Sequence, residues 1–154
     1  MTMTDAQREL LGMYRATPDI LRGLTRGLTD DDARTGGEGS DSWSPVEIVC
    51  HLRDAEERSM ARTRMMRDED RPALIGYDEN ELAEQGRYRE QSLTAVVEEL
   101  IRLREEHIRE LEALTEDQWS REGEHNQMGT LSIQSITHHM AFHDAVHLAQ
   151  LGRT

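Results

Sequence analysis

Residues 43–56, WSPVEIVCHLRDAE, contain the clearest helix start in this 154-residue chain. Ser44 can cap the helix, Pro45 suits the first helical position, and Glu47 can reach back to the backbone N–H of the cap. After this start, small and apolar residues recur at steps of three and four, which predicts one buried helical stripe. His51 lies at the edge of that stripe.

Outward from this stretch, helical periodicity recurs in three other segments. Thr17-Pro18 in the first segment either starts a second helical piece or kinks one continuous helix. The connections are predicted as an exposed loop over 29–41, a polar loop that can hold a short helix over 71–90, and an irregular stretch over 122–129. The further helices are expected over about 3–27, 92–114 and 130–151. The prediction is an all-α four-helix bundle forming a single domain over residues 1–154.

Charge excludes one class of partner. The chain has 31 acidic and 18 basic residues, a net charge of −13, and every basic residue is an arginine. These arginines alternate with acidic residues along the predicted helices instead of forming a basic patch, so we expect no nucleic-acid partner.

Cysteine use and hydropathy indicate a compartment. The lone Cys50 excludes an internal disulfide framework and suits a reducing compartment. We expect Cys50 to act as a small buried apolar residue, and the alternative, a reactive thiol, is less consistent with its position. No run approaches the roughly 18 apolar residues of a membrane span. We therefore expect a soluble, cytoplasmic protein without a membrane partner.

The last predicted helix places two histidines in its apolar stripe. At about 100° per residue from Ile133, His143 falls near 280° and His147 near 320°, beside the apolar positions. His139 falls at the border, and His138 on the far side should face water. Two histidines four residues apart on one helix face can hold one metal ion.

A third ligand would come from another helix. His51 can lie opposite the last helix in a bundle, and three neutral imidazoles leave a coordination position open for water or substrate, as in catalytic sites. The alternative is that His51, His143 and His147 are ordinary core residues with hydrogen-bonded rings. Periodicity alone does not separate the two readings.

Two carboxylates lie near these histidines in the sequence. Asp54 follows His51 by about one turn and Asp144 is next to His143, so either could orient an imidazole or act as a base. The alternative is that Asp54 and Asp144 are both solvated. We also expect four other polar residues to be solvated, namely Glu56, Glu57, His107 and His125.

Two segments resemble a known family. Residues 43–56 resemble the pattern W-S-x-x-E-x-x-x-H-L-x-D of the DinB/YfiT-like superfamily, and residues 143–151, HDAVHLAQL, resemble its closing H-x-x-x-H-x-x-Q segment. The chain also matches the family in length and helix order. The resemblance implies an up-down-down-up four-helix bundle, commonly a homodimer, with a divalent ion such as zinc or nickel on His51, His143 and His147.

The resemblance implies a site more firmly than a reaction. Family members include S-transferases that use a low-molecular-weight thiol and proteins described as metal-dependent hydrolases, so the implied partner is a small-molecule substrate. Many members have arginine and glycine where this chain has Leu148-Ala149, which leaves a thiol cofactor in doubt. A non-enzymatic binding or stress-response module is the alternative.

Overall fold

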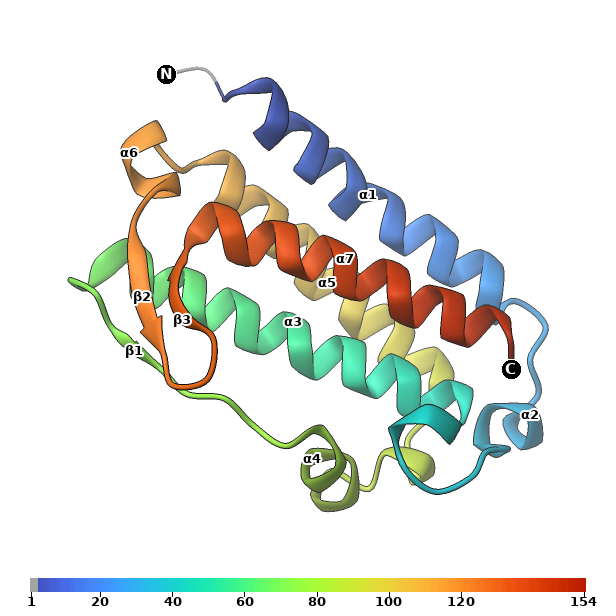
Figure 1. The fold of residues 1–154 in the computed structure, drawn as a ribbon. Helices are drawn as coiled ribbons and strands as arrows, with labels where there is room; N and C mark the ends of the chain where they lie inside the picture. The colour runs from blue at the N-terminus through green and yellow to red at the C-terminus, as the bar shows by residue number, and fades with distance from the viewer. Residues whose placement is uncertain (1–2) are drawn as a thin grey trace.

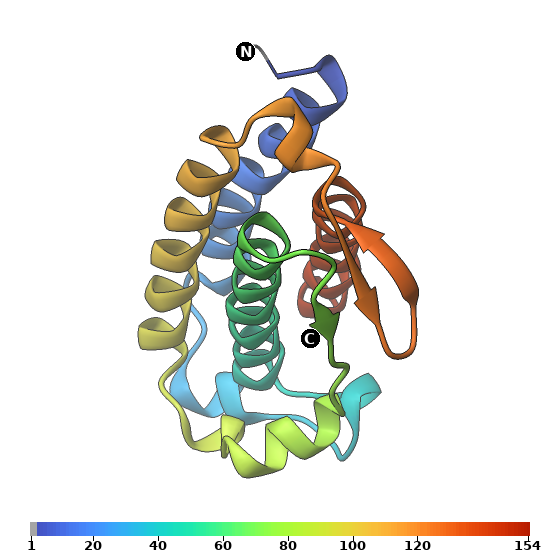
Figure 2. The same ribbon diagram turned by 90° about the vertical axis from the view of Figure 1, so that its left-hand side faces the viewer.

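Over residues 3–154, the computed structural model has four long helices that pack as a bundle (Figure 1). α1 and α7 run in one direction and α3 and α5 in the other, as both views show (Figures 1 and 2). This confirms the predicted all-α bundle with up-down-down-up order. The bounds are α1 (Asp5–Thr25), α3 (Pro45–Asp68), α5 (Leu93–Glu112) and α7 (Ile133–Gly152).

Capping residues fix where the helices begin. Ser44 forms the predicted capping box with Glu47, whose Oε1 accepts the Ser44 N–H at 3.0 Å. Ser132 caps α7 in the same way with Ser135. Each box satisfies backbone N–H groups that the first turn of a helix leaves without a partner. Both helices that carry the predicted site therefore start at defined residues.

α1 continues through Pro18 as one helix. A proline inside a helix lacks the N–H that would bond to the carbonyl four residues earlier, here Tyr14. The buried Arg104 of α5 donates an Nη1–H to the Tyr14 oxygen at 3.1 Å. A side chain from another helix thus satisfies the carbonyl that Pro18 leaves free.

The connections contain more structure than the sequence indicates. Residues 122–129, expected to be irregular, contain β2 and the turn to β3, with His125 paired to Gly129. β1 joins β2 in parallel, which gives a small sheet in the order β1-β2-β3. The short elements are α2 (Asp30–Arg34), a 3₁₀ turn (Ser40–Ser42), β1 (Ala73–Leu74), α4 (Glu79–Gln85), a 3₁₀ turn (Tyr88–Glu90), α6 (Glu116–Trp119), β2 (Glu122–His125) and β3 (Gly129–Ser132).

The core forms two apolar clusters along the bundle axis. One gathers the start of α3, the start of α5 and the end of α7, and the other gathers their opposite ends with α1. Leu10, Leu11 and Tyr14 of α1 are buried in the second cluster and so pack within their own chain. The bundle also buries charged side chains, among them Glu56, Arg104 and Asp144. No helix in residues 3–154 has the length and apolarity needed to cross a membrane.

Candidate metal centre

Three imidazoles meet between α3 and α7, at the level where the two apolar clusters end. His51 lies in the second turn of α3, and His143 and His147 lie one turn apart on α7. α3 and α7 pack directly against each other. The structure thus brings together the three histidines that the sequence singles out.

The ring nitrogens are close enough to share an ion. The Nε2 atoms of His51 and His143 lie 2.9 Å apart, and one ring nitrogen from each of the three histidines lies within 4.8 Å of the others. Ring centroids are 4.5 Å apart for both pairs that include His147. Nitrogens that bind one zinc ion lie about 2.0–2.1 Å from it and hence up to about 4 Å from one another. The three rings are near that arrangement.

Burial keeps two of the rings neutral. His51 is 3% exposed, and burial together with the neighbouring His143 and His147 lowers its pKa to about 3. Burial and the adjacent His147 likewise lower the pKa of His143 to about 3. The Trp43 ring covers His51 with centroids 5.0 Å apart. A neutral imidazole is the form that binds a metal, so these pKa shifts favour coordination.

Gln150 orients His147. Its Oε1 lies 2.9 Å from His147 Nδ1, and its Nε2 donates to the Ser40 carbonyl at 2.7 Å. An amide oxygen only accepts, so His147 Nδ1 carries a proton, and in the neutral imidazole Nε2 then holds the lone pair. A hydrogen bond to the nitrogen away from the ion is the usual way in which proteins fix a metal-binding histidine.

Two further polar groups border the three rings. A Glu79 oxygen, at the start of α4, lies 3.8 Å from His51 Nε2. His143 Nδ1 is buried and has no hydrogen-bond partner among the described residues. Three imidazoles face one another, and the hydrogen bond to Gln150 fixes the tautomer of His147. Such a set of nitrogen ligands fits a divalent ion such as zinc or nickel.

The two carboxylates considered from the sequence contact other residues. Asp54 accepts hydrogen bonds from Arg53 and from the Tyr88 hydroxyl. Asp144 is 3% exposed and points into the core, where Arg104 and Thr17 donate to it. Adjacent residues on a helix point about 100° apart, so Asp144 and His143 face different sides of α7. Of the two, neither accepts a hydrogen bond from an imidazole of the trio, and Gln150 has that role instead.

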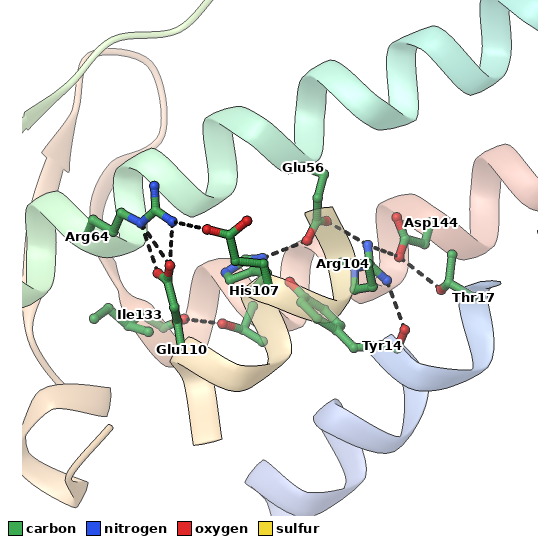
Figure 3. A network of polar contacts seen from close by, with 11 residues as sticks. Tyr14, Thr17, Glu56, Arg64, Arg104, His107, Glu110, Ile133 and Asp144 are labelled. Atoms are coloured by element: carbon green, nitrogen blue, oxygen red, sulfur yellow. Dashed lines mark hydrogen bonds and ion pairs between the residues drawn. The ribbon is translucent and has the colours of Figure 1, made fainter. Parts of the chain in front are cut away.

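Asp144 belongs to a buried network next to the site (Figure 3). Arg104 Nη2 lies 2.7 Å from a Glu56 oxygen and 2.8 Å from Asp144 Oδ2, and His107 Nδ1 lies 2.7 Å from the other Glu56 oxygen. Glu56 and His107 are fully buried, which corrects the expectation that both are solvated. The reason is pairing, because charged groups enter a core when their charges and hydrogen bonds are matched.

The sequence contains a signal for this network. Glu56 lies four residues after Leu52, and Arg104 and His107 share a helical face with Leu100 and Leu111, so a helical count places all three in apolar stripes. Gln150 is part of the family pattern but has no assigned role there. Glu79 lies in a polar segment with no distinguishing signal.

The remaining sequence expectations have mixed outcomes. Cys50 is fully buried, and burial raises the pKa of its thiol to about 12, which confirms the small apolar reading. His138 and Glu57 are exposed as expected, and His139, which the helical count places at the border of the apolar stripe, is also exposed. His125 is only 7% exposed, which corrects the expectation of a solvated loop residue. It is buried because it ends β2 and its ring accepts N–H groups of the following turn.

The comparisons with known proteins agree with this architecture. A protein of Geobacillus thermodenitrificans (strain NG80-2) named "Putative metal-dependent hydrolase" is 33% identical over 76 residues, or 49% of this chain and 42% of that protein. The match thus spans less than half of that relative. The fold is similar to that of YfiT from Bacillus subtilis, described as "a probable metal-dependent hydrolase with an unusual four-helix bundle topology". That likeness has a TM-score of 0.89 and 19% identity over 99% of this chain and 87% of that chain, so it concerns the fold.

A sequence profile of the DinB superfamily matches residues 13–151, which include all three histidines and Gln150. The chain therefore belongs to the DinB superfamily.

Proposed function

We propose that His51, His143 and His147 bind one divalent ion, zinc or nickel, and that the chain is a metal-dependent enzyme acting on a small molecule. The observation that carries this proposal is the convergence of three imidazoles from two helices within 4.8 Å. His51 is buried and His143 and His147 are half-buried. Removing polar rings from water is costly unless they share a purpose, and a common ion supplies one.

Once bound, the ion would supply Lewis-acid chemistry, lowering the pKa of the water or thiol it holds so that a nucleophile forms near neutral pH. The chain's own residues would hold the ion and orient its ligands. Three protein ligands leave a coordination position open for a reactant. Gln150 holds the His147 ring in one tautomer, and Trp43 shields His51 from bulk water.

Hydrolysis is the reaction we propose first, since two similar proteins are described as metal-dependent hydrolases. Thiol S-transfer would use the same three ligands. In this chain Leu148 packs into the core and leaves only Ala149 exposed between His147 and Gln150, so this turn offers no charged group to a thiol cofactor. A non-enzymatic binding module is the alternative from another class.

Metal content tests the site. Protein prepared without a histidine tag, loaded with zinc or nickel and dialysed, should contain about one ion per chain by elemental analysis. His51→Ala and His147→Ala should each remove most of the ion, because two imidazoles hold it much more weakly than three. His139→Ala is the matched control, since His139 is an exposed histidine on the same helix. Wild-type protein with much less than one ion per chain would contradict the proposal.

Turnover tests the enzyme class. The loaded protein is incubated with activated esters in water, and separately with low-molecular-weight thiols and electrophiles. We expect ester hydrolysis that disappears with a chelator, returns with the ion and is lost in His147→Ala. Ligand binding without turnover in either assay would favour the non-enzymatic module.

A further inference from the structure

A cavity of about 150 Å³ lies beside His143, one of the three imidazoles. Its walls come from α3, α7, the β2–β3 turn and the residues after β1, which lie on one side of the bundle (Figures 1 and 2). His143 lines it, so the cavity adjoins the proposed metal centre. The other polar side chains used below are Arg62, Tyr77 and His125, and Ile136 and Met140 form part of the apolar wall.

His125 offers a hydrogen-bond donor to this cavity. Its Nδ1 accepts the backbone N–H groups of Gln127 and Met128, each at 3.1 Å. The ring proton must therefore be on Nε2, and among the described residues no acceptor bonds to that N–H. The side chain is 7% exposed. Because His125 lines the cavity and its Nε2–H has no protein acceptor, the N–H is free to donate to a ligand there.

Arg62 adds a positive charge that no carboxylate neutralises. Its one hydrogen bond among the described residues goes from Nη2 to the Ile75 carbonyl, at 2.6 Å. Its guanidinium carbon lies 5.7 Å from the centre of the Tyr77 ring, whose other neighbour is Arg58 at 4.4 Å. Burial lowers the pKa of Arg62, which reflects partial removal of its charge from water.

The donors face a cavity without acidic residues. The chain has 31 aspartates and glutamates, yet none is among the described residues that line the cavity. His143 also lines the cavity, but its Nδ1 is buried and is not one of the donors that reach a ligand there. Nitrogen donors with one net positive charge, against an apolar wall, match an anionic oxygen acceptor on a small apolar body.

We propose that this cavity binds the carboxylate of a small substrate, with Arg62 and His125 as the donors that select it. The proposal rests on the proposed function, because the cavity serves a substrate only if the neighbouring histidines bind the ion. A dry cavity of about 150 Å³ accommodates benzene, so the ligand part inside should have roughly four to seven non-hydrogen atoms.

Calorimetric titration with butyrate and its neutral isostere butyramide tests this, using both zinc-loaded and metal-free protein. Butyrate should bind to both forms, and butyramide about tenfold or more weakly, because the charged hydrogen bonds are lost. Arg62→Met should weaken butyrate binding about tenfold. Arg58→Met is the matched control, since Arg58 is the other guanidinium on Tyr77 and does not line the cavity. It should leave the affinity within about twofold.

A second measurement uses the wild-type protein, so it does not require any variant to fold. In protein with ¹⁵N-labelled histidine, butyrate should shift the Nε2–H signal of His125, and butyramide should shift it less. Equal affinities for the two probes, equal effects of Arg62→Met and Arg58→Met, or butyrate binding only to zinc-loaded protein would each overturn the proposal. Butyrate binding as expected in a protein that takes up no zinc would instead refute the metal-dependent function and leave the carboxylate site standing.

Discussion

Gln150 determines which nitrogen of His147 faces the other two imidazoles. Without its oxygen, the His147 ring can rotate or change tautomer, and a bound ion would have to restore the order. We predict that Gln150→Leu lowers zinc affinity about 10–100-fold, measured by competition with a chelator. Gln134→Leu on the same helix should leave zinc affinity unchanged, since Gln134 bonds to Gln7, far from the site. Equal affinities for the two variants would refute the orienting role.

Glu56 should make stability depend on acid pH. Burial alone would raise its pKa, but Arg104 and a hydrogen bond from His107 outweigh burial and lower it to about 2. A carboxylate whose pKa is lower in the folded state than in the unfolded one stabilises the fold above the unfolded value, about 4.3, and loses this contribution as pH falls toward 2. Asp144 opposes this trend, because burial raises its pKa.

We therefore predict that Glu56→Gln lowers the free energy of unfolding of the metal-free protein at pH 7 by about 3–5 kcal/mol, because Arg104 keeps a buried charge with one partner fewer. The difference from wild type should shrink as pH falls from about 4.5 to 2. Urea denaturation over this range measures it. Glu57→Gln, at the exposed neighbouring position, should behave as wild type throughout. A difference that does not change with pH would contradict the assignment.

Whether a buried polar residue can be predicted from the sequence depends on which residue types are considered when positions are counted around a helix. The count applied to α7 finds His143 and His147, since both lie among apolar positions. The same count on α5 would reach Arg104, but a charged residue in an apolar stripe looks like an error until its partner on another helix is known. Pairing between helices decides burial here, and the sequence does not show which residues pair.

The β2–β3 hairpin depends on one glycine at the element scale. A Cβ at Gly123 would lie 2.9 Å from Leu74 Cδ1 and 3.1 Å from Met66 Cγ, both in the core. We predict that Gly123→Val lowers the free energy of unfolding by about 1–3 kcal/mol through overpacking. Gly12→Ala is the control and should have the opposite effect, since no atom lies within 4 Å of the added methyl and α1 gains a better helix former. It should raise the free energy of unfolding by about 0.5–1 kcal/mol.

The elements differ in how well their sequence signals work. Ser44, Pro45 and Glu47 predict the start of α3 because a capping box and its apolar stripe are local features. The hairpin has no such signal. β2 reads Glu-Gly-Glu-His and lacks apolar alternation, and its pairing with β3 and β1 is a tertiary feature.

At the scale of the whole molecule, we propose that the chain forms the homodimer implied by its family resemblance, through the outer face of α1 and α7. Phe142 and Val146 of α7 are 63% and 46% exposed, and Met13 and Ile20 of the adjacent α1 are 49% and 46% exposed. Phe142→Glu should convert the dimer to a monomer in light scattering, because it places a charge in the apolar interface. Glu98→Gln on α5 is a control that should remain dimeric. Monomeric wild-type protein would refute this proposal.

The site itself requires α3 and α7 to hold their three imidazoles around one ion. X-ray absorption at the zinc edge of loaded, tag-free protein tests this most directly. We predict three imidazole nitrogens at about 2.0–2.1 Å in the wild-type protein and a lower imidazole count in His51→Ala. A zinc environment made of oxygen ligands, or one that His51→Ala leaves unchanged, would show that these histidines do not hold the ion.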